Sequence, residues 1–346
     1  MRKILLAIVF VLMTAMSAWS AGELNLYIWS EYMGPEIVPN FEKETGVKVR
    51  VDYYETMEDM MAKLQAGGMS QYDVVVPTDY GVPAMIKLGL LKELDHSKIP
   101  NMKNLNPKFV NAPYDPQNAH TVAYQWGTLG MIYNKNKIEG PVPSWSIMFD
   151  ESKQVGPFVL LDSMREMLGI TQCYLGLDVN TTNTDELKKV AELMLAAKKS
   201  ANFQGFDVGV GGRSKVLSGG AVAAITYNGD GLRGVEEDPE NVAFANPAEG
   251  TVIWVDNMAI PANAPNPEAA YQFINYILDA KVGAGLSNWT RYATPNDAAK
   301  PFITPEDVAN IAIYPTSEYM EKLQFLNDLG DNARVYDELW TMIKTR

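Results

Sequence analysis

Cysteine and histidine are nearly absent from this chain of 346 residues, which holds one cysteine, Cys173, and two histidines, His96 and His120. A lone cysteine cannot form an internal disulfide. Because no histidine is near it in sequence, we interpret Cys173 as a buried, inert thiol rather than a nucleophile. The histidines lie in loop-like segments without metal-ligand spacing. With no Ser–His, Cys–His or glycine-rich phosphate motif present, we expect no metal, no cofactor and no enzymatic activity.

Basic residues are also scarce, at 29 lysines and arginines against 42 acidic residues, for a formal net charge of −13. Residues 1–20 hold two basic residues, Arg2 and Lys3, and no acidic one, so their removal takes the net charge to −15. An acidic surface disfavours nucleic acid as a partner and suits a cationic ligand. Acidic solubility alone also explains such a charge in many proteins.

Long apolar runs are missing, apart from one at the N-terminus. Arg2 and Lys3 precede the apolar residues 4–13, and Ala18-Trp19-Ser20 precedes Ala21. This order is typical of a cleaved secretory signal peptide. No later stretch approaches the 18 or so apolar residues that a membrane helix needs, and no cysteine near the cleavage site offers a lipid anchor. The sequence predicts a signal peptide over residues 1–20, cleaved near Ser20–Ala21, and a mature protein free in the periplasm.

Strand-like and helix-like segments alternate along the chain. Predicted strands at residues 23–29, 47–54 and 72–77 are separated by predicted helices, and a similar series begins at residue 156. Such alternation is typical of a doubly wound parallel sheet. Residues 119–134 predict two strand-like runs joined at Gly127 to Gly130, and residues 305–346 predict an almost entirely helical end.

Two segments are expected to cross between lobes, one near Gly130 and one through Trp254. A chain that leaves one α/β lobe, builds another and returns makes a hinged cleft. We therefore predict an α/β fold of two lobes, each a sheet flanked by helices. The predicted domain limits are residues 21–129 with 255–297 for lobe 1, and 130–254 with 298–346 for lobe 2.

The strand-like stretch 251–264 carries an indole and a carboxylate two residues apart, at Trp254 and Asp256. Strand side chains alternate between faces, so both should point the same way. A ring face attracts a cation and covers methylenes, while a carboxylate accepts its N–H donors. The pair therefore suits a ligand that is cationic and apolar. A core tryptophan beside a solvated aspartate is the alternative.

Polar and aromatic residues also follow the predicted strands. Trp29, Ser30 and Glu31 end the first strand, and Thr78 and Tyr80 follow the third. In doubly wound sheets, ligands bind at the carboxyl ends of the strands. A second group, Glu166 and Tyr227-Asn228-Gly229-Asp230, follows later strands in the same way. For Glu166, a carboxylate favoured by the helix dipole is the alternative.

These motifs together resemble a known family over essentially the whole mature chain. The chain is similar to the periplasmic polyamine-binding proteins that feed spermidine and putrescine ABC importers, which have a two-lobed, hinged, type II-like fold. The resemblance rests on the following motifs: Tyr27-Ile-Trp-Ser-Glu-Tyr32, Phe41-Glu-Lys-Glu-Thr-Gly46, Tyr72-Asp-Val-Val-Val-Pro77, Tyr124-Gln-Trp-Gly127, Trp254-Val-Asp-Asn-Met-Ala-Ile-Pro261 and Tyr292-Ala-Thr-Pro-Asn296.

The resemblance implies three kinds of ligand-binding residue. Aromatic walls along the polyamine methylenes would be Trp29, Tyr227 and Trp254, with Tyr292 as a further wall or hydroxyl. Hydrogen-bonding groups at one end would be Ser30, Thr78 and Tyr80. The carboxylates that receive ammonium groups would be Glu31, Glu166, Asp230 and Asp256, with no evident basic partner.

Four positions bear on which polyamine is bound. Tyr227 stands where family members usually have Trp, Ser163 where spermidine-preferring members have Asp, and Leu326 where those members have Gln. Asp230 matches an Asp that is typical of putrescine-specific members. The choice between putrescine and spermidine therefore stays open.

The sequence predicts a monomeric solute-binding protein that captures a polyamine between two lobes and presents it to a membrane permease. A binding protein of the same fold for another small cationic or polar solute is one alternative, and a polyamine sensor is another. Paired acids such as Glu166 and Asp256 could also serve a glycosidase, but nothing else in the sequence supports that activity.

Overall fold

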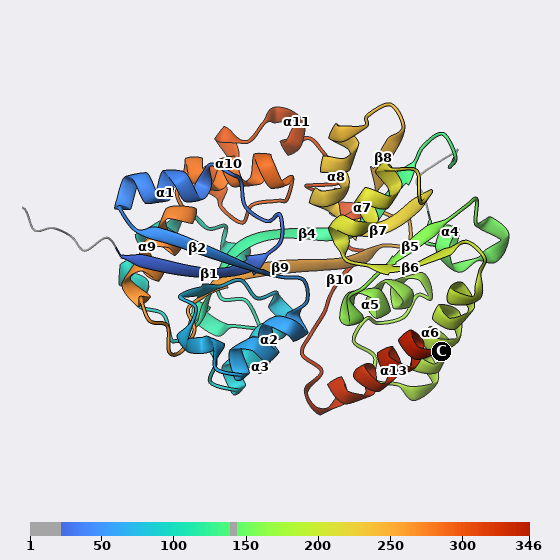
Figure 1. Cartoon of the computed structure of the whole chain (residues 1–346), viewed down its shortest axis with the longest axis horizontal. Coiled ribbons are helices and arrows are strands. Elements are labelled where there is room, and N and C mark those ends of the chain that lie inside the picture. The colour runs from blue at the N-terminus through green and yellow to red at the C-terminus, as the bar shows by residue number, and fades with distance from the viewer. Residues whose placement is uncertain (1–21, 139–143) are drawn as a thin grey trace, which may run out of the picture.

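In the part of the chain that the structure describes, one curled sheet of ten strands runs through the molecule, with helices on both faces (Figure 1). The computed structural model describes residues 22–138 and 144–346, so the predicted signal peptide lies outside the described residues. The strand order is β2-β1-β3-β9-β4-β7-β5-β6, with β10 beside β9 and β8 beside β4. The strands are β1 (Glu23–Trp29), β2 (Lys48–Tyr54), β3 (Val74–Val75), β4 (Thr121–Asn134), β5 (Phe158–Leu161), β6 (Phe203–Asp207), β7 (Ala223–Tyr227), β8 (Val242–Ala245), β9 (Thr251–Ala259) and β10 (Leu323–Phe325).

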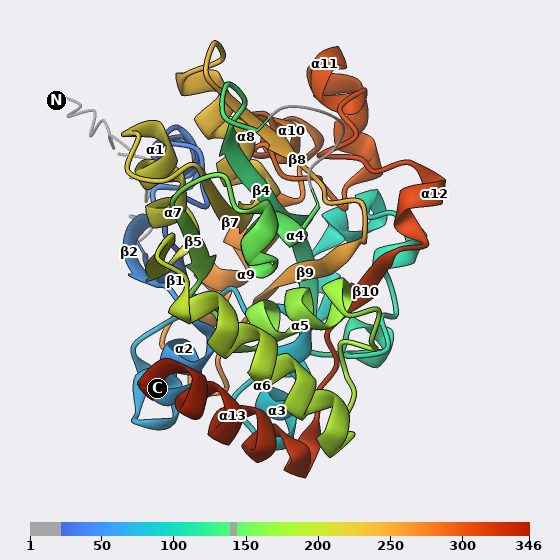
Figure 2. The same cartoon turned by 90° about the vertical axis from the view of Figure 1, so that its right-hand side faces the viewer.

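The helices fall into two groups, one around each half of the sheet (Figures 1 and 2). Within residues 22–138 and 144–346, none has the length and apolar character that a membrane crossing requires. They are α1 (Ile37–Thr45), α2 (Met57–Gln65), α3 (Val82–Lys87), α4 (Ser146–Phe149), α5 (Met164–Tyr174), α6 (Thr184–Lys199), α7 (Gly209–Leu217), α8 (Asn228–Glu237), α9 (Pro267–Ile277), α10 (Ala280–Thr290), α11 (Pro305–Val308), α12 (Ser317–Met320) and α13 (Ala333–Thr345).

In the first half, β1 lies between β2 and β3 and is parallel to both. Its alternating residues pack on two sides: Leu24 and Leu26 join the core with Phe41 of α1, and Tyr27 packs with Met60 of α2. Helix α2 begins where the capping pattern predicts, because the Thr56 side chain accepts a hydrogen bond from the Asp59 amide at 3.1 Å. The alternation in the sequence correctly predicted this layer.

In the second half, β5 lies between β6 and β7 and is parallel to both. It is buried on both faces, with Phe158 and Leu160 in one core and Val159 in another. Cys173 of α5 is buried in the first of these cores, where burial raises the pKa of its thiol to about 12. Figure 2 shows α13 beside α6 at the edge of this half.

Two antiparallel strands join the halves. Residues 121–128 of β4 pair with β9, and residues 129–133 of the same strand pair with β7. The predicted break at Gly127 to Gly130 is therefore wrong, because β4 is one strand of 14 residues. These glycines mark close packing rather than a turn: a Cβ on Gly127 would lie 2.6 Å from the Trp254 ring, and one on Gly130 would lie 2.2 Å from the Phe244 ring.

The C-terminal region is the second departure from the sequence-based prediction. Residues 305–346 are not almost entirely helical, because α11 and α12 have four residues each and Leu323–Phe325 forms β10, parallel to the start of β9. A strand of three residues is too short to show a period. Just before this region, Ala299 and Ile303 pack on Ala284 of α10.

The division of the chain into two lobes at the predicted residue limits stays a prediction.

The close contact at Gly130 predicts a destabilised variant. In Gly130→Ala, the new methyl group would meet the Phe244 ring at 2.2 Å and the Ala245 carbonyl oxygen at 2.8 Å. We expect the free energy of unfolding to fall by about 1–3 kcal/mol, as in other overpacked sites, measured by urea denaturation. Gly220→Ala is the matched control, since its methyl group would have no neighbour closer than 3.5 Å. Equal losses in both variants would contradict this account of β4.

Candidate ligand-binding site

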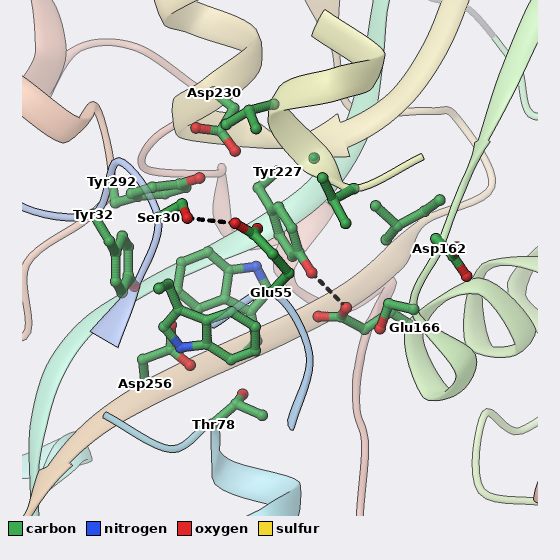
Figure 3. A pocket seen from close by; sticks show the side chains of 17 residues that line it. Ser30, Tyr32, Glu55, Thr78, Asp162, Glu166, Tyr227, Asp230, Asp256 and Tyr292 are labelled. Atoms are coloured by element: carbon green, nitrogen blue, oxygen red, sulfur yellow. Dashed lines mark hydrogen bonds between the residues drawn. The ribbon is translucent and has the colours of Figure 1, made fainter. Parts of the chain in front are cut away.

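A pocket lies where the carboxyl ends of β1, β5 and β7 face the middle of β9 (Figure 3). It encloses about 660 Å³, including its open mouth. Its position agrees with the rule that ligands bind at the carboxyl ends of strands in such sheets. The pocket is lined by Trp29, Ser30, Tyr32, Glu55, Thr78, Leu161, Asp162, Ser163, Glu166, Val208, Gly209, Val210, Tyr227, Asp230, Trp254, Asp256 and Tyr292.

The structure brings most of the predicted site residues together in this pocket. Two do not line it: Glu31 forms ion pairs beside it, and Tyr80 lines a different cavity. Those in the pocket are Trp29, Ser30, Thr78, Glu166, Tyr227, Asp230, Trp254, Asp256 and Tyr292. Whether each contacts a ligand stays a prediction.

Aromatic rings form the walls of the pocket. The Trp254 ring makes edge-to-face contacts with Tyr292, at 5.1 Å between centroids, and with Tyr227, at 6.0 Å. Trp29 is held from outside the pocket, because its indole N–H donates to the Val76 carbonyl oxygen at 2.9 Å. Edge-to-face packing fixes the ring planes. The result is a rigid, apolar lining with defined faces.

Three carboxylates reach the pocket and are almost fully buried, with exposed fractions of 5% for Glu166, 7% for Asp230 and 6% for Asp256. Glu166 accepts a hydrogen bond from the Tyr227 hydroxyl at 2.6 Å. Asp256 shares a face of β9 with Trp254, as the two-residue spacing predicts. In Figure 3, Asp256 and Tyr32 lie on one side of the pocket and Glu166 lies on the other.

Burial and mutual repulsion disfavour the charged forms of these groups. Burial raises the pKa of Asp256 well above its ordinary value, and the negative charges of Asp79 and Glu166 raise it further. Burial likewise raises the pKa of Glu166, although the Ser163 and Tyr227 hydroxyls oppose this. For Asp230, burial raises the pKa to about 6 in spite of the nearby Arg213 guanidinium. A bound cation would reverse these shifts.

Glu31 has two basic partners, which the sequence did not reveal. Its Oε2 atom lies 3.0 Å from Arg213 Nη2 of α7 and 3.0 Å from Arg233 Nη1 of α8. The expectation that the site acids lack basic partners is therefore wrong for Glu31, and also for Asp230, whose Oδ1 lies 4.0 Å from Arg213 Nη1. Arginines more than 180 positions from Glu31 cannot be paired with it by sequence spacing.

With this geometry in place, comparison with known proteins identifies the family. The sequence profile of the bacterial extracellular solute-binding proteins matches residues 36–316. The chain belongs to this family. The α/β fold with a helix-flanked sheet, predicted from the sequence, is confirmed as that of a periplasmic binding protein.

This solute-binding protein has curated relatives along nearly its whole length. A spermidine/putrescine-binding periplasmic protein of Salmonella typhimurium is 32% identical over 96% of this chain and 94% of the relative. A putrescine-binding periplasmic protein of Pseudomonas aeruginosa is 35% identical over 93% and 92%. Among solved structures, a spermidine/putrescine ABC transporter substrate-binding protein of Streptococcus pneumoniae superposes with a TM-score of 0.78 at 28% identity, over 93% of this chain and 98% of that one.

Four polar or aromatic lining residues of this solute-binding protein are absent from the predicted ligand-binding set, namely Tyr32, Glu55, Asp162 and Ser163. Tyr32 is buried against Tyr124, Tyr292 and Trp254. Glu55 directly follows β2 and accepts a hydrogen bond from the Ser30 hydroxyl, and Asp162 directly follows β5. The rule that found Ser30 and Thr78, polar residues at strand ends, would also have found Glu55 and Asp162.

Of the two predicted residues that miss the pocket, Tyr80 lies on the far side of β9. A second cavity is lined by Tyr80, Leu326 and the β9 residues Ile253 and Val255, whereas Trp254 and Asp256 face the first pocket. Strand alternation explains this division. Leu326, which replaces a family Gln, thus lines the second cavity.

The raised pKa of Asp256 predicts a stability effect in the ligand-free protein. Because the folded-state pKa lies above the unfolded one, the buried charge destabilises the fold at high pH, and this penalty disappears as pH falls through the folded-state pKa. Asp256→Asn should therefore raise the melting temperature at pH 8 by roughly 1–3 °C, and by less at pH 5.

Differential scanning calorimetry of ligand-free protein measures this effect. The exposed Asp331 provides the control, since Asp331→Asn should leave the melting temperature unchanged at both pH values. A lower melting temperature for Asp256→Asn at pH 8 would show instead that the Asp256 carboxylate stabilises the empty pocket.

Proposed function

We propose that this protein captures a polyamine, putrescine and/or spermidine, in the pocket and delivers it to a membrane ABC permease. One observation carries the proposal: Glu166 and Asp256 are buried carboxylates at the pocket, and among the described residues no lysine, arginine or histidine lies within ion-pair distance of either. Buried carboxylates are normally paired with a cation or with N–H donors. A cationic ligand would supply what these two lack.

The buried carboxylate of Asp79 shows how such a group is usually stabilised without a cation. The Asp79 carboxylate accepts hydrogen bonds from the backbone N–H groups of Tyr80, at 2.8 Å, and Val255, at 3.2 Å. Among the described residues, Asp256 receives no backbone N–H donor and has only the Tyr32 and Thr78 hydroxyls beside it, while Glu166 has the Tyr227 and Ser163 hydroxyls. The two pocket carboxylates therefore keep free acceptor positions toward the pocket. Ammonium groups, each with three donors and one positive charge, complement such acceptors.

The aromatic lining of the pocket suits the carbon chain that connects the amines of a polyamine. The carbon chain between two amines needs apolar surface, and the walls around Trp254, Tyr227 and Tyr292 provide it in the same pocket as the carboxylates. Ring faces also attract alkylammonium ions directly. A neutral sugar would leave Glu166 and Asp256 without counter-charges, and an amino acid with a single ammonium group would neutralise only one of them while adding a carboxylate of its own. A flexible alkyl chain with an amine at each end suits the pocket better.

Transport requires the bound state to differ from the empty one. Trp29 and Thr78 come from the first half of the sheet, and Glu166 and Tyr227 come from the second. A ligand that contacts both halves stabilises the arrangement in which they are close, so binding would favour a closed form. We propose that the closed monomer is the species that docks on the permease, in the periplasm, after removal of the signal peptide.

Calorimetric titration of refolded, ligand-free protein with putrescine and with spermidine tests the proposal. We expect one-to-one binding of at least one amine, because two buried carboxylates acquire counter-charges at once. Glutamate serves as an anionic control and should give no heat. If neither amine bound, the pocket would serve another cationic or polar solute.

Removal of one carboxylate should weaken this binding. We expect Asp256→Asn to reduce the affinity for putrescine by more than tenfold, because one desolvated ammonium loses its counter-charge. The same titration measures the loss, and Asp331→Asn at the exposed position provides the control. Unchanged affinity in Asp256→Asn would remove this residue from the site.

Binding should also depend on pH in a defined direction. Asp230 has a pKa of about 6, and burial raises the pKa values of Glu166 and Asp256, so acid protonates carboxylates that face the pocket. The affinity for putrescine should therefore fall between pH 8 and pH 5, while the amine stays charged. Titration near pH 6 in two buffers of different ionisation enthalpy should detect proton release on binding. Equal affinity at pH 8 and pH 5 would contradict the assignment.

A further inference from the structure

Asp79 lies behind the ligand pocket, where the chain leaves β3 and passes beside β9. It is only 2% exposed, and it lines the second cavity rather than the pocket. Its carboxylate accepts hydrogen bonds from the Val255 N–H at 3.2 Å, the Tyr80 N–H at 2.8 Å and the Thr78 hydroxyl at 3.3 Å. Because it does not line the pocket, Asp79 can affect a bound ligand only indirectly.

The Val255 N–H group lies at a gap in the strand pairing of β9. On the side of β9 that faces away from β4, β10 pairs with residues 251–253 and β3 pairs with Ala259. Trp126 of β4 is opposite Val255, but its own N–H and carbonyl groups bond to Ala293. The Val255 N–H therefore points into the gap between β10 and β3, where the Asp79 carboxylate takes the place of a neighbouring strand.

Three residues of the pocket lining adjoin this hydrogen bond. Val255 stands between Trp254 and Asp256 in β9, and both of these face the pocket. Thr78 directly precedes Asp79, lines the same pocket and forms an isolated β-bridge with Asp256 (Figure 3). The Asp79 carboxylate therefore connects the two chain segments that carry these three side chains. Hydrogen bonds to an ionised acceptor are stronger than those to a neutral one.

We propose that Asp79 is a positioning residue of the ligand site: its carboxylate holds β9 at Val255 and so fixes the directions of the Trp254 and Asp256 side chains. This inference rests on the proposed function, because it concerns the affinity of the pocket for its ligand. Asp79 acts through the backbone of β9, since the position of one strand residue determines where the side chains on either side of it point.

This hold on β9 should depend on pH, because Asp79 can be protonated. Burial raises the pKa of Asp79 to about 7, although its three hydrogen-bond donors oppose this, and the Glu166 carboxylate raises it further. The other titratable groups that face Asp79 are Asp256 on β9 and the hydroxyls of Tyr80 and Tyr114. None of the described lysines, arginines and histidines lies within ion-pair distance of it. Below pH 7 the protonated carboxyl group loses an acceptor site, so the hold on β9 weakens.

The test is the affinity of refolded, ligand-free protein for putrescine or spermidine, whichever the wild type binds more tightly, measured by calorimetry at pH 8 and at pH 5.5. The D79N side chain keeps the wild-type volume and, like the protonated wild-type side chain, carries no charge. At pH 8 we expect D79N to bind the amine about tenfold more weakly, the effect of one lost hydrogen bond to a charged acceptor. At pH 5.5 the two proteins should bind it equally within about twofold, because Asp79 is then protonated in the wild type.

D73N is the matched control. Asp73 is also buried, at 0% exposed, and its carboxylate also accepts hydrogen bonds from backbone N–H groups, those of Asn25 at 2.7 Å and of Asn266. It directly precedes β3, at the end of that strand away from Thr78, and it lines neither the pocket nor the second cavity. D73N can lower the stability of the fold, but its affinity for the amine should match that of the wild type at both pH values.

The possible outcomes separate this inference from the proposed function. If the wild type bound neither amine, the proposed function would fail and the inference with it. If the wild type bound an amine and D79N bound it no more weakly at pH 8, only the inference would be overturned. A loss in D79N that is the same at pH 8 and pH 5.5 would also overturn it, because Asp79 would then be a structural residue. An equal pH-dependent loss in D73N would do the same.

A measurement on the wild type alone covers the case in which D79N does not fold. Hydrogen exchange in the ligand-free protein reports on single backbone N–H groups, and protection factors correct for the intrinsic effect of pH on exchange. Between pH 8 and pH 5.5, the protection factor of the Val255 N–H should fall about tenfold relative to that of the Asn25 N–H, which Asp73 holds. Equal changes at the two N–H groups would overturn the proposal.

Discussion

The pairing of β4 with β9 is the constraint on which the rest of the structure depends. β4 pairs with β9 along its first part and with β7 along its second, so one continuous strand belongs to both halves of the sheet. All nine residues of β9 are buried. Its alternation sends Trp254 and Asp256 to the pocket and Ile253 and Val255 to the cavity behind. The backbone hydrogen bonds between β4 and β9 therefore connect the two halves and also determine which way the side chains of Trp254 and Asp256 point.

The pocket concentrates negative charge that the empty protein does not neutralise. Burial of Glu166 and Asp256 costs free energy, and repulsion between them adds to that cost. Elsewhere in the fold, a buried carboxylate such as Asp79 is satisfied by backbone N–H groups. Proteins tolerate such local instability where a ligand removes it. Under the proposed function, the same groups that weaken the empty fold would strengthen ligand binding.

A charge network beside the pocket connects the pocket residue Asp230 with the contact between the halves. Glu31 follows β1 in the first half, and its partners Arg213 and Arg233 come from α7 and α8 in the second. Arg213 also lies beside the pocket residue Asp230. Glu31 adopts a left-handed backbone conformation with φ of 51°, an unusual state for a residue other than glycine. The position of this carboxylate is therefore set by the surrounding structure.

Local patterns in the sequence determined much of this protein. Strand alternation, helix caps and strand-end residues predicted β1, β9 and α6 and most of the pocket lining, because these signals act over a few neighbouring residues. Tertiary structure alone decided that β4 is unbroken at Gly130, that residues 323–325 form a strand, and that Glu31 meets Arg213 and Arg233. Each of these features depends on groups that are distant in sequence and come into contact only when the halves pack together. A periodic pattern in the local sequence carries no information about such contacts.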